Sequence, residues 1–399
     1  GIYTFGTVMS NIANTGVTGI HPKDLIKSWL KNYTIPVTVN GQTIGARPYV
    51  IDFLIAPWLH KAGVSGTIDM TNWESLWNAA NENEILYNAP FKLTAIVNRI
   101  DLRGNSGYSP GLHNTGETRF IFSLVDPYAG IPPIQCNNNF ACLDFLDWKG
   151  MNIIFEFGNV QTNICQVRSF AQQWLALSSL TLGSNDYKTA LENITRTVLN
   201  AGGAPGKING SAINRIRTNE RIFDNAGKSS SSWMYSDWEF RQFELDATSG
   251  LFVQVPLTNT PVNSANATQD LSYSPTIPLT TADQNNLINW VFSSPANLAR
   301  VHNGTHSMPN TYGGLPLKSG GARVDAEYTH FWDLNWFATA SDAPNYGPYI
   351  PVDPNSVYYK QVRQQLSLNT CSGCHNGETK TIFTEVMPMG YGTPANYWT

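Results

Sequence analysis

The feature that most constrains the fold is a set of short segments rich in β-branched and aromatic residues, each bounded by Gly, Pro or Asn. Segments of this composition are typical of β-strands. Three of them lie at residues 91–102, 118–125 and 151–160, and three more follow at about 213–223, 238–246 and 250–256. The sequence therefore predicts a sheet built from these strands.

Two segments between the third and fourth strands have helical periodicity instead. In residues 166–178 and 185–201, apolar side chains recur three and four positions apart, which is the spacing of one face of an α-helix. Shorter helices are expected at 22–32, 283–293 and 356–368. Strands interleaved with a helical pair, without a strict strand–helix–strand rhythm, predict an α+β fold with a mainly antiparallel sheet, packed helices and long irregular loops.

The loops and the domain organisation follow from the remaining segments. Residues 257–281 are rich in Ser, Asn, Thr and Pro, and residues 303–355 are rich in Gly, Pro and Tyr, so both are expected to be mostly irregular. A chain of 399 residues can form one large domain or two to three ordinary ones. We expect an α+β main body over 1–354 and a C-terminal segment, 355–399, packed on it.

The low fraction of charged residues bears on where in or outside the cell the protein works. Asp, Glu, Lys and Arg make up only 14% of the chain, against roughly 25% in an average soluble domain. Asn, Ser, Thr and Gly supply polarity in their place. This balance favours a secreted, extracellular or cell-surface protein, with the periplasm as an alternative. The chain starts at Gly1 without a Met, as a processed export precursor or a trimmed chain does.

Charge and hydropathy also exclude two classes of partner. The net charge is −4 and no basic patch is present, which argues against nucleic acid as a partner. The longest apolar run, near 49–64, is interrupted by Asp52 and His60. Because it falls short of the roughly 18 residues of a membrane helix, we expect no transmembrane segment.

The sharpest chemical signal is the run Cys371-Ser372-Gly373-Cys374-His375. Covalent attachment of haem needs two thiols spaced to reach both vinyl groups of one porphyrin, and a His directly after the second Cys to bind the iron. The run supplies all three groups in five residues. Two alternatives are a short Cys371–Cys374 disulfide and half of a zinc site, the latter weakened because no second Cys/His cluster has ligand spacing.

These five residues resemble the attachment motif of c-type cytochromes. The resemblance implies haem c as the cofactor, with Cys371 and Cys374 as attachment residues and His375 as the proximal ligand. Only 24 residues follow His375, too few for the fold of a small cytochrome c. The wider chain resembles a group of large uncharacterised secreted bacterial proteins with a C-terminal CxxCH motif, in the runs FKLTAIVNRIDLR at 91–103, GETRFIF at 116–122 and LSLNTCSGCHNGET at 366–379.

Several residues are candidates for the distal ligand of such a haem. Met387 and Met389 lie 12 and 14 residues after His375, enough chain to wrap around the edge of the porphyrin. Ordinary packing is the competing interpretation for both. Alternatives from the main body are His302, His306 and His330, and the iron can also remain five-coordinate. Glu378 is a candidate to orient the His375 imidazole.

The other cysteines allow one further disulfide. A turn at Lys149-Gly150 would pair 143–147 with 151–157 as a hairpin, and the return strand would bring Cys142 beside Cys165. We therefore predict a Cys142–Cys165 disulfide. Because the chain has five cysteines, one thiol remains unpaired in either interpretation of the CSGCH run.

Charged residues gather on the predicted strands of this charge-poor chain. Residues two positions apart on a strand share a face, so these charges are expected to pair with one another. The favoured interpretation is a solvated sheet face or a structural ion-pair network, and the alternative is a pocket that positions a ligand. The residues are Arg99, Asp101, Glu117, Arg119, Glu156, Arg215, Arg217, Glu220, Arg221, Glu239, Arg241 and Glu244.

The sequence thus predicts a secreted or cell-surface protein with one covalent c-type haem and a role in electron transfer or redox chemistry, working with a redox or cell-surface protein partner. The alternative is a non-catalytic surface or complex-forming protein in which CSGCH is a structural disulfide turn. Hydrolase and phosphate-binding motifs are missing from the chain, so no enzyme class is indicated.

Overall fold

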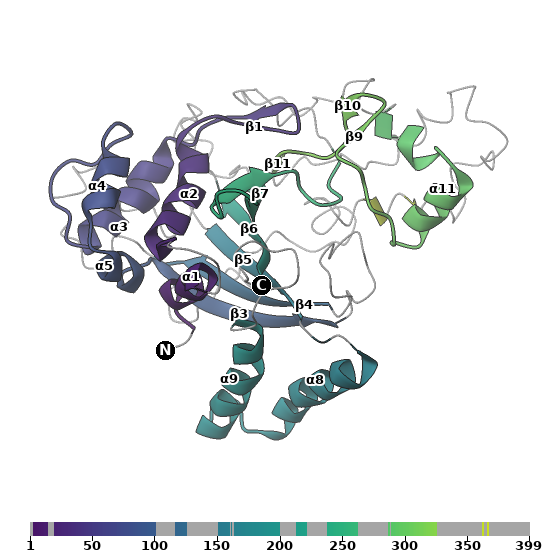
Figure 1. Ribbon diagram of the computed structural model, residues 1–399, viewed down its shortest axis with the longest axis horizontal. Coiled ribbons are helices and arrows are strands. Elements are labelled where there is room, and N and C mark those ends of the chain that lie inside the picture. The colour runs from purple at the N-terminus through teal and green to yellow at the C-terminus, as the bar shows by residue number, and fades with distance from the viewer. Residues whose placement is uncertain are drawn as a thin grey trace, which may run out of the picture.

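The computed structural model describes residues 3–14, 20–100, 116–125, 151–159, 161, 163–199, 213–221, 238–261, 286–287, 289–324, 361–362 and 365–366. Over these residues the protein has an α+β fold, as the sequence predicts. Helices pack on one face of an antiparallel sheet, and a smaller lobe lies beside it (Figure 1).

The sheet has seven strands within the described residues, in the order β11-β7-β6-β5-β4-β3, and β8 also pairs with β7. Each of the six predicted strands forms, with ends that differ by up to three residues from the expected ones. All of the strand pairs are antiparallel. The strands are β3 (Phe91–Arg99), β4 (Glu117–Leu124), β5 (Met151–Gly158), β6 (Ile213–Arg221), β7 (Trp238–Leu245), β8 (Phe252–Val255) and β11 (Ala322–Val324).

The pairing of strand β5 is inconsistent with the hairpin predicted around Lys149-Gly150. The strand pairs with β4 on one edge and with β6 on the other along almost its whole length. Neither edge is left for a partner at 143–147, so the predicted hairpin around Lys149-Gly150 is wrong.

One face of the sheet carries the main hydrophobic core. Side chains alternate between the two faces of a strand, and the inner set on β4 and β5 is aromatic, with Phe120, Phe122, Phe155 and Phe157 fully buried. The centre of the core is Phe5, whose ring lies 4.9–6.3 Å from five other aromatic rings. Such pairs stabilise beyond the area they bury.

The N-terminal helices cover this face. Helix α2 begins with Pro22 at its first turn and carries Asp24 near its start and Lys31 near its end, which suits both the backbone and the helix dipole. Most of the apolar run at 49–64 is helical and buried. The elements are α1 (Phe5–Asn14), α2 (Pro22–Thr34), the π-helix η1 (Ile51–Ile55), α3 (Ala56–Lys61), α4 (Trp73–Ala79) and α5 (Glu82–Tyr87).

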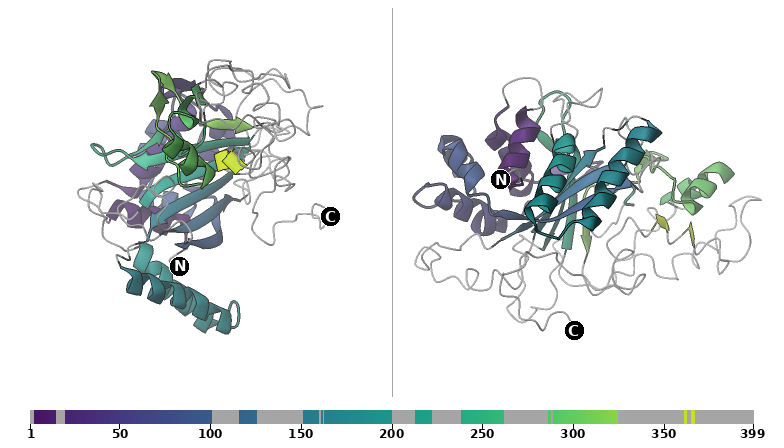
Figure 2. Two further views of the ribbon diagram at one scale, coloured as in Figure 1. Left: turned by 90° about the vertical axis from the view of Figure 1, so that its right-hand side faces the viewer. Right: turned by 90° about the horizontal axis from the view of Figure 1, so that it is seen from below.

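The predicted helical pair lies between β5 and β6. Helix α8 (Ile164–Ala176) is capped by Asn163 and continues into the 3₁₀ turn η4 (Leu177–Ser179), and α9 (Asn185–Leu199) follows. The two helices lie side by side, and α9 also contacts α1 and β5 (Figure 2). The prediction of both helices is confirmed.

A second hydrophobic core forms the smaller lobe. It contains Trp290, Val301, Met308 and Leu317, and also Val362 and Leu366 from the segment that precedes the CSGCH run. The lobe carries α11 (Pro295–His302) and the strands β9 (Thr311–Tyr312) and β10 (Leu315–Pro316), and it contacts the hairpin of β1 (Val37–Val39) and β2 (Gln42–Ile44). The short strands β9, β10 and β11 lie within 303–355, and the other described residues of that range, up to 324, are mostly irregular, as the sequence predicts.

Among the described residues, no helix is long and apolar enough to span a membrane.

Candidate functional site

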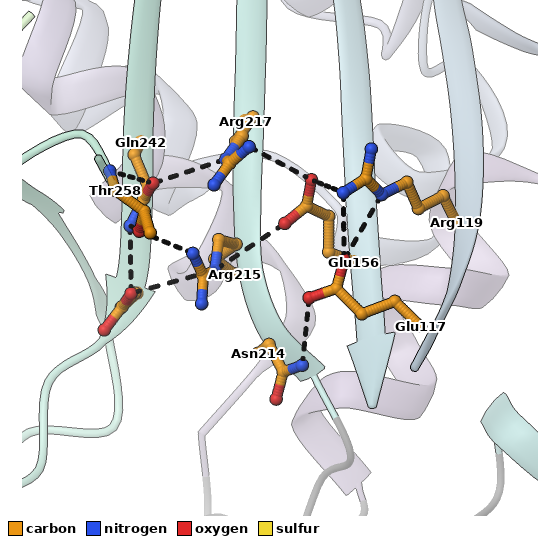
Figure 3. A network of polar contacts seen from close by, with 9 residues as sticks. Glu117, Arg119, Glu156, Asn214, Arg215, Arg217, Gln242 and Thr258 are labelled. Atoms are coloured by element: carbon orange, nitrogen blue, oxygen red, sulfur yellow. Dashed lines mark hydrogen bonds and ion pairs between the residues drawn. The ribbon is translucent and has the colours of Figure 1, made fainter. Parts of the chain in front are cut away.

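Two networks of buried charges occupy opposite faces of the sheet. The first, the polar-face network, lies on the side away from α1 and α2 and is drawn in Figure 3. It consists of Glu117, Arg119, Glu156, Asn214, Arg215, Arg217, Gln242, Glu244 and Thr258.

Glu156 on β5 is the centre of the polar-face network. Its Oε1 lies 3.2 Å from Arg119 Nη2 and 3.6 Å from Arg217 Nη1, and its Oε2 lies 3.6 Å from Arg215 Nε (Figure 3). Burial alone raises the pKa of this carboxyl, but the three guanidinium groups outweigh burial and hold the pKa below its usual value. Glu156 is therefore an ionised carboxylate.

The pKa of Glu117 on β4 is shifted in the opposite direction, above its usual value. Glu117 accepts hydrogen bonds from Arg119 Nη2 at 3.0 Å and from Asn214 Nδ2 at 3.4 Å. Burial raises its pKa, and the nearby charge of Glu156 raises it further. Two carboxyls that share Arg119 thus differ in how readily they hold a proton, because the guanidinium charges outweigh burial at Glu156 and do not outweigh it at Glu117.

A polar limb joins this network to the segment after β8. Arg215 Nη1 donates to Thr258 Oγ1 at 2.6 Å, and Arg217 Nε donates to Gln242 Oε1 at 3.3 Å. Gln242 in turn donates to Glu244 and Thr258 at 3.0 and 3.1 Å. The limb anchors the chain as it leaves the sheet.

A tight glycine turn before β4 and a β-bulge on β6 help to position the side chains of the polar-face network. Gly116, just before β4, has φ +87°, and a Cβ there would lie 2.3 Å from the carbonyl oxygen of Arg99. Only glycine fits this approach. The pairing of β5 with β6 shifts by one residue between Glu156 and Phe157, which leaves Asn214 extra on β6 and sets Arg215 opposite Glu156.

The second network, the core-face network, lies between the sheet and α2. Arg47 makes a two-pronged contact with Glu239, from Nε and Nη2 at 2.8 Å each. Arg241 Nη2 donates to Glu239 at 3.0 Å, and its Nε lies 3.6 Å from Glu220. The guanidinium carbon of Arg241 lies 4.4 Å from the centre of the Tyr33 ring, a cation–π contact.

The prediction that strand charges pair with one another is confirmed for the described residues, and burial excludes a solvated face. Glu117, Glu156, Arg215, Glu220 and Arg241 are each at most 1% exposed. Opposite charges contact one another within each network, as the interpretation of a structural ion-pair network requires. Arg99 is half-buried at the end of β3, Arg221 ends β6, and Asp101 lies outside the described residues.

The smaller lobe contains a different group, the imidazole of His306. It is 2% exposed, its ring lies 6.0 Å from the ring of Trp290, and neither ring nitrogen has a hydrogen-bond partner among the described residues. Burial lowers the pKa of this imidazole to about 4. The ring is therefore neutral, which is the form that can bind a metal ion.

The remaining predicted site residues lie mostly beyond what the structure describes. Cys371, Cys374, His375, Met387, Met389, Glu378, His330 and Cys142 are outside the described residues. Cys165 is an exposed free thiol in the first turn of α8, and its pairing with Cys142 stays a prediction. His302 lies at the end of α11, with Nδ1 3.0 Å from Asn303 Oδ1.

Three comparisons with known proteins were made, and no family model, no curated protein and no solved structure matches the chain. Within the described residues, no group of three or more His, Cys, Asp and Glu side chains is arranged to hold a metal ion.

The burial of two residues, Arg47 and His306, had little or no signal in the sequence, although His306 is among the candidate distal ligands. Arg47 lies outside any strand-like run, yet it binds Glu239, 192 positions later. His306 appears in the sequence among small polar residues. Its burial arises from tertiary packing in the second core, which no local pattern reveals.

Proposed function

We propose that the protein works outside the cytoplasm and carries one covalently attached c-type haem near its C-terminus, with a role in electron transfer or redox chemistry. The observation that carries the proposal is the CSGCH run at 371–375. In a chain with five cysteines and seven histidines, this order of two thiols and an imidazole is rare by chance.

Each residue of the run has a separate task. Cys371 and Cys374 would hold the porphyrin through thioether bonds, and His375 would bind the iron from the proximal side. When bound, haem supplies an iron that accepts or gives up a single electron. Met387 and Met389 are the sequence candidates for the distal side. A redox protein or a cell-surface protein is the partner class that this chemistry implies.

Two structural observations support the proposal. Val362 and Leu366 are buried in the second core, so the chain is held by apolar packing five residues before Cys371. His306 in the same lobe is a buried imidazole without a hydrogen-bond partner among the described residues, and a metal ligand has this character. The low charge content of the chain agrees with a location outside the cytoplasm.

Intact mass under denaturing and reducing conditions tests the proposal. The chain is produced with an export signal in a host that attaches haem to exported proteins, beside a matched Cys371→Ala/Cys374→Ala variant. We expect the parent to be heavier by one haem and the variant to have the mass of the bare chain. A parent with the bare mass, and two thiols released from CSGC on reduction, would establish the structural disulfide turn instead.

A further inference from the structure

We propose that the end of the α8–α9 hairpin docks on a lipid membrane and inserts shallowly into it. This end, the hairpin apex, comprises residues 175–184: the end of α8, the 3₁₀ turn η4 and the residues that lead into α9. The inference goes beyond the proposed function and does not depend on it. Every residue that carries it belongs to the described part of the chain.

The first observation is the position of the hairpin apex. Helices α8 and α9 run side by side away from the sheet, and the turn that joins them lies at the end farthest from it (Figure 1 and Figure 2). The contacts of the hairpin with β5 and α1 are made by α9. A projecting end of this kind reaches a flat surface before the rest of the protein does.

The second observation is the exposure of two leucines at the hairpin apex. Leu175 is 71% exposed and Leu182 is 80% exposed, and among the exposed large apolar side chains of the described residues only Tyr87 exceeds them. The neighbouring Leu177 and Leu180 pack against the main core instead. Leu175 and Leu182 are therefore not needed for the packing of the hairpin. Exposed apolar side chains that gather in one place mark a surface that binds a membrane or another protein.

The third observation is the absence of charge around the hairpin apex. Residues 169–185 contain no Asp, Glu, Lys, Arg or His, so no charge has to lose its water when the apex enters lipid. Residues 175–184 also contain no arginine and no aromatic residue. These residue types anchor most protein–protein interfaces, and their absence favours lipid over a protein partner.

The fourth observation is that hydroxyl groups of the hairpin apex are hydrogen-bonded within it. Ser178 and Ser179 donate to the carbonyl oxygens of Leu175 and Ala176, at 2.7 Å each. Carbonyl groups at the end of a helix otherwise lack a partner. The hydroxyl oxygen of Ser184 accepts from a backbone N–H in the first turn of α9 at 3.1 Å. These bonds lower the cost of moving the apex out of water, because polar groups in lipid need partners from the protein.

The charges of the chain indicate which kind of lipid surface fits. The charges nearest to the hairpin apex are Arg168 on one side and Asp186 on the other, and they have opposite signs. The whole chain has a net charge of −4, which opposes binding to anionic lipid. Recognition through the leucines requires no charged headgroup, so binding to a membrane without net charge should be insensitive to salt.

The experiment is flotation of the full chain with vesicles of phosphatidylcholine at low and high salt. We expect the parent to float with the vesicles under both conditions. Leu175→Gln/Leu182→Asn should weaken the binding by about a hundredfold, or about tenfold for each leucine. Leu315→Gln is the matched control, because Leu315 is a 44% exposed leucine on β10 of the smaller lobe, and it should bind as the parent does.

Three flotation results would overturn the inference: a parent that does not float, equal binding by the parent and the double leucine variant, or binding only to anionic vesicles and only at low salt. Sedimentation velocity without lipid tests a second copy of the chain as the occupant. A parent dimer that the double leucine variant dissociates would assign the hairpin apex to self-association instead. Circular dichroism shows whether each variant has kept its fold.

The same experiment separates this inference from the haem proposal. The Cys371→Ala/Cys374→Ala variant cannot attach haem, and it should float with phosphatidylcholine vesicles as the parent does. Equal flotation supports the hairpin apex as the docking surface, whether or not the parent carries haem. Loss of flotation in this variant would show that the C-terminal segment, and not the apex, binds the vesicles.

Discussion

Glu220 on β6 and Glu239 on β7 lie directly opposite each other in the sheet, and the same surroundings shift their pKa values in opposite directions. Burial raises the pKa of Glu220 well above its usual value, and the charge of Glu239 adds to this effect although Arg241 opposes it. Burial also acts on Glu239, but Arg241 and Arg47 outweigh it and hold the pKa well below the usual 4.5. One carboxyl of the pair is ionised and the other favours its proton.

This asymmetry predicts different effects for the same substitution at the two positions. Glu239→Gln leaves Arg47 and Arg241 without their shared anion inside the protein, and we expect a loss of about 3–5 kcal/mol in the free energy of unfolding at pH 7. Glu220→Gln removes a group that is costly to ionise, so the change should be near zero or stabilising. Urea unfolding measures both, and equal losses for the two variants would contradict the assignment.

The pH dependence of stability follows from the same two shifts. The lowered pKa of Glu239 stabilises the fold above the unfolded value of 4.5, and this contribution is lost as the pH falls below 4.5. The raised pKa of Glu220 acts in the other direction, since its contribution is present below 4.5 and is lost as the pH rises. We expect Glu239→Gln to flatten the acid limb of the stability curve and Glu220→Gln to flatten the limb above 4.5. Thermal unfolding from pH 3 to 8 tests this, and unchanged limbs would contradict it.

Arg241→Ala tests whether the core-face network is excluded from solvent, as its burial indicates. Arg241 is fully buried, contacts two carboxyls and lies over Tyr33. We expect a loss of about 3–5 kcal/mol. Lys31→Ala is the matched control, because Lys31 and Glu74 form an exposed pair at 3.1 Å, and exposed pairs contribute at most about 1 kcal/mol. Equal melting temperatures for Arg241→Ala and the parent would show that the network is hydrated.

Gly116→Ala should distort the entry into β4 and with it the polar-face network. Alanine at φ +87° is strained by about 1–3 kcal/mol, and its Cβ would overlap the backbone at Arg99 in addition. Gly183→Ala separates the two effects, because Gly183 has φ +78° but no atom within 4 Å of the added Cβ. Calorimetry should show a clearly larger loss for Gly116→Ala. Similar losses would mean that the overlap relaxes freely.

The Cys142–Cys165 disulfide remains a prediction, although the hairpin from which it was argued does not form. The exposure of Cys165 on α8 makes it accessible to oxidation or alkylation, and closing a loop of this length would stabilise by about 3 kcal/mol. Non-reducing peptide mapping should recover a linked Cys142–Cys165 peptide, absent from a Cys165→Ser variant. A link from Cys136 to either residue, or complete alkylation of Cys165 without reduction, would contradict it.

The sequence predicts the strands well because their composition is a local property. Which face a charge occupies is not local. Arg215 and Arg217 share a face, as do Glu239 and Arg241, but the register of β6 with β7 puts the two pairs on opposite sides of the sheet. The bulge at Asn214 changes the alternation once more. Helices α4 and α5 are too short for a clear period in the sequence. Tertiary contacts with Trp58 on α3 hold them, through the ring of Trp77 on α4 and a hydrogen bond from Trp58 Nε1 to the carbonyl oxygen of Ile85 on α5.

The outer edge of β7 is divided between two short strands from distant parts of the chain. Residues 242–245 pair with β8, and residues 238–240 pair with β11, more than eighty positions later. Unpaired strand edges recruit other chains and lead to aggregation. While the protein is being synthesised, half of this edge has no partner until residues 322–324 emerge. By covering this part of the edge, β11 protects the sheet from pairing with other chains.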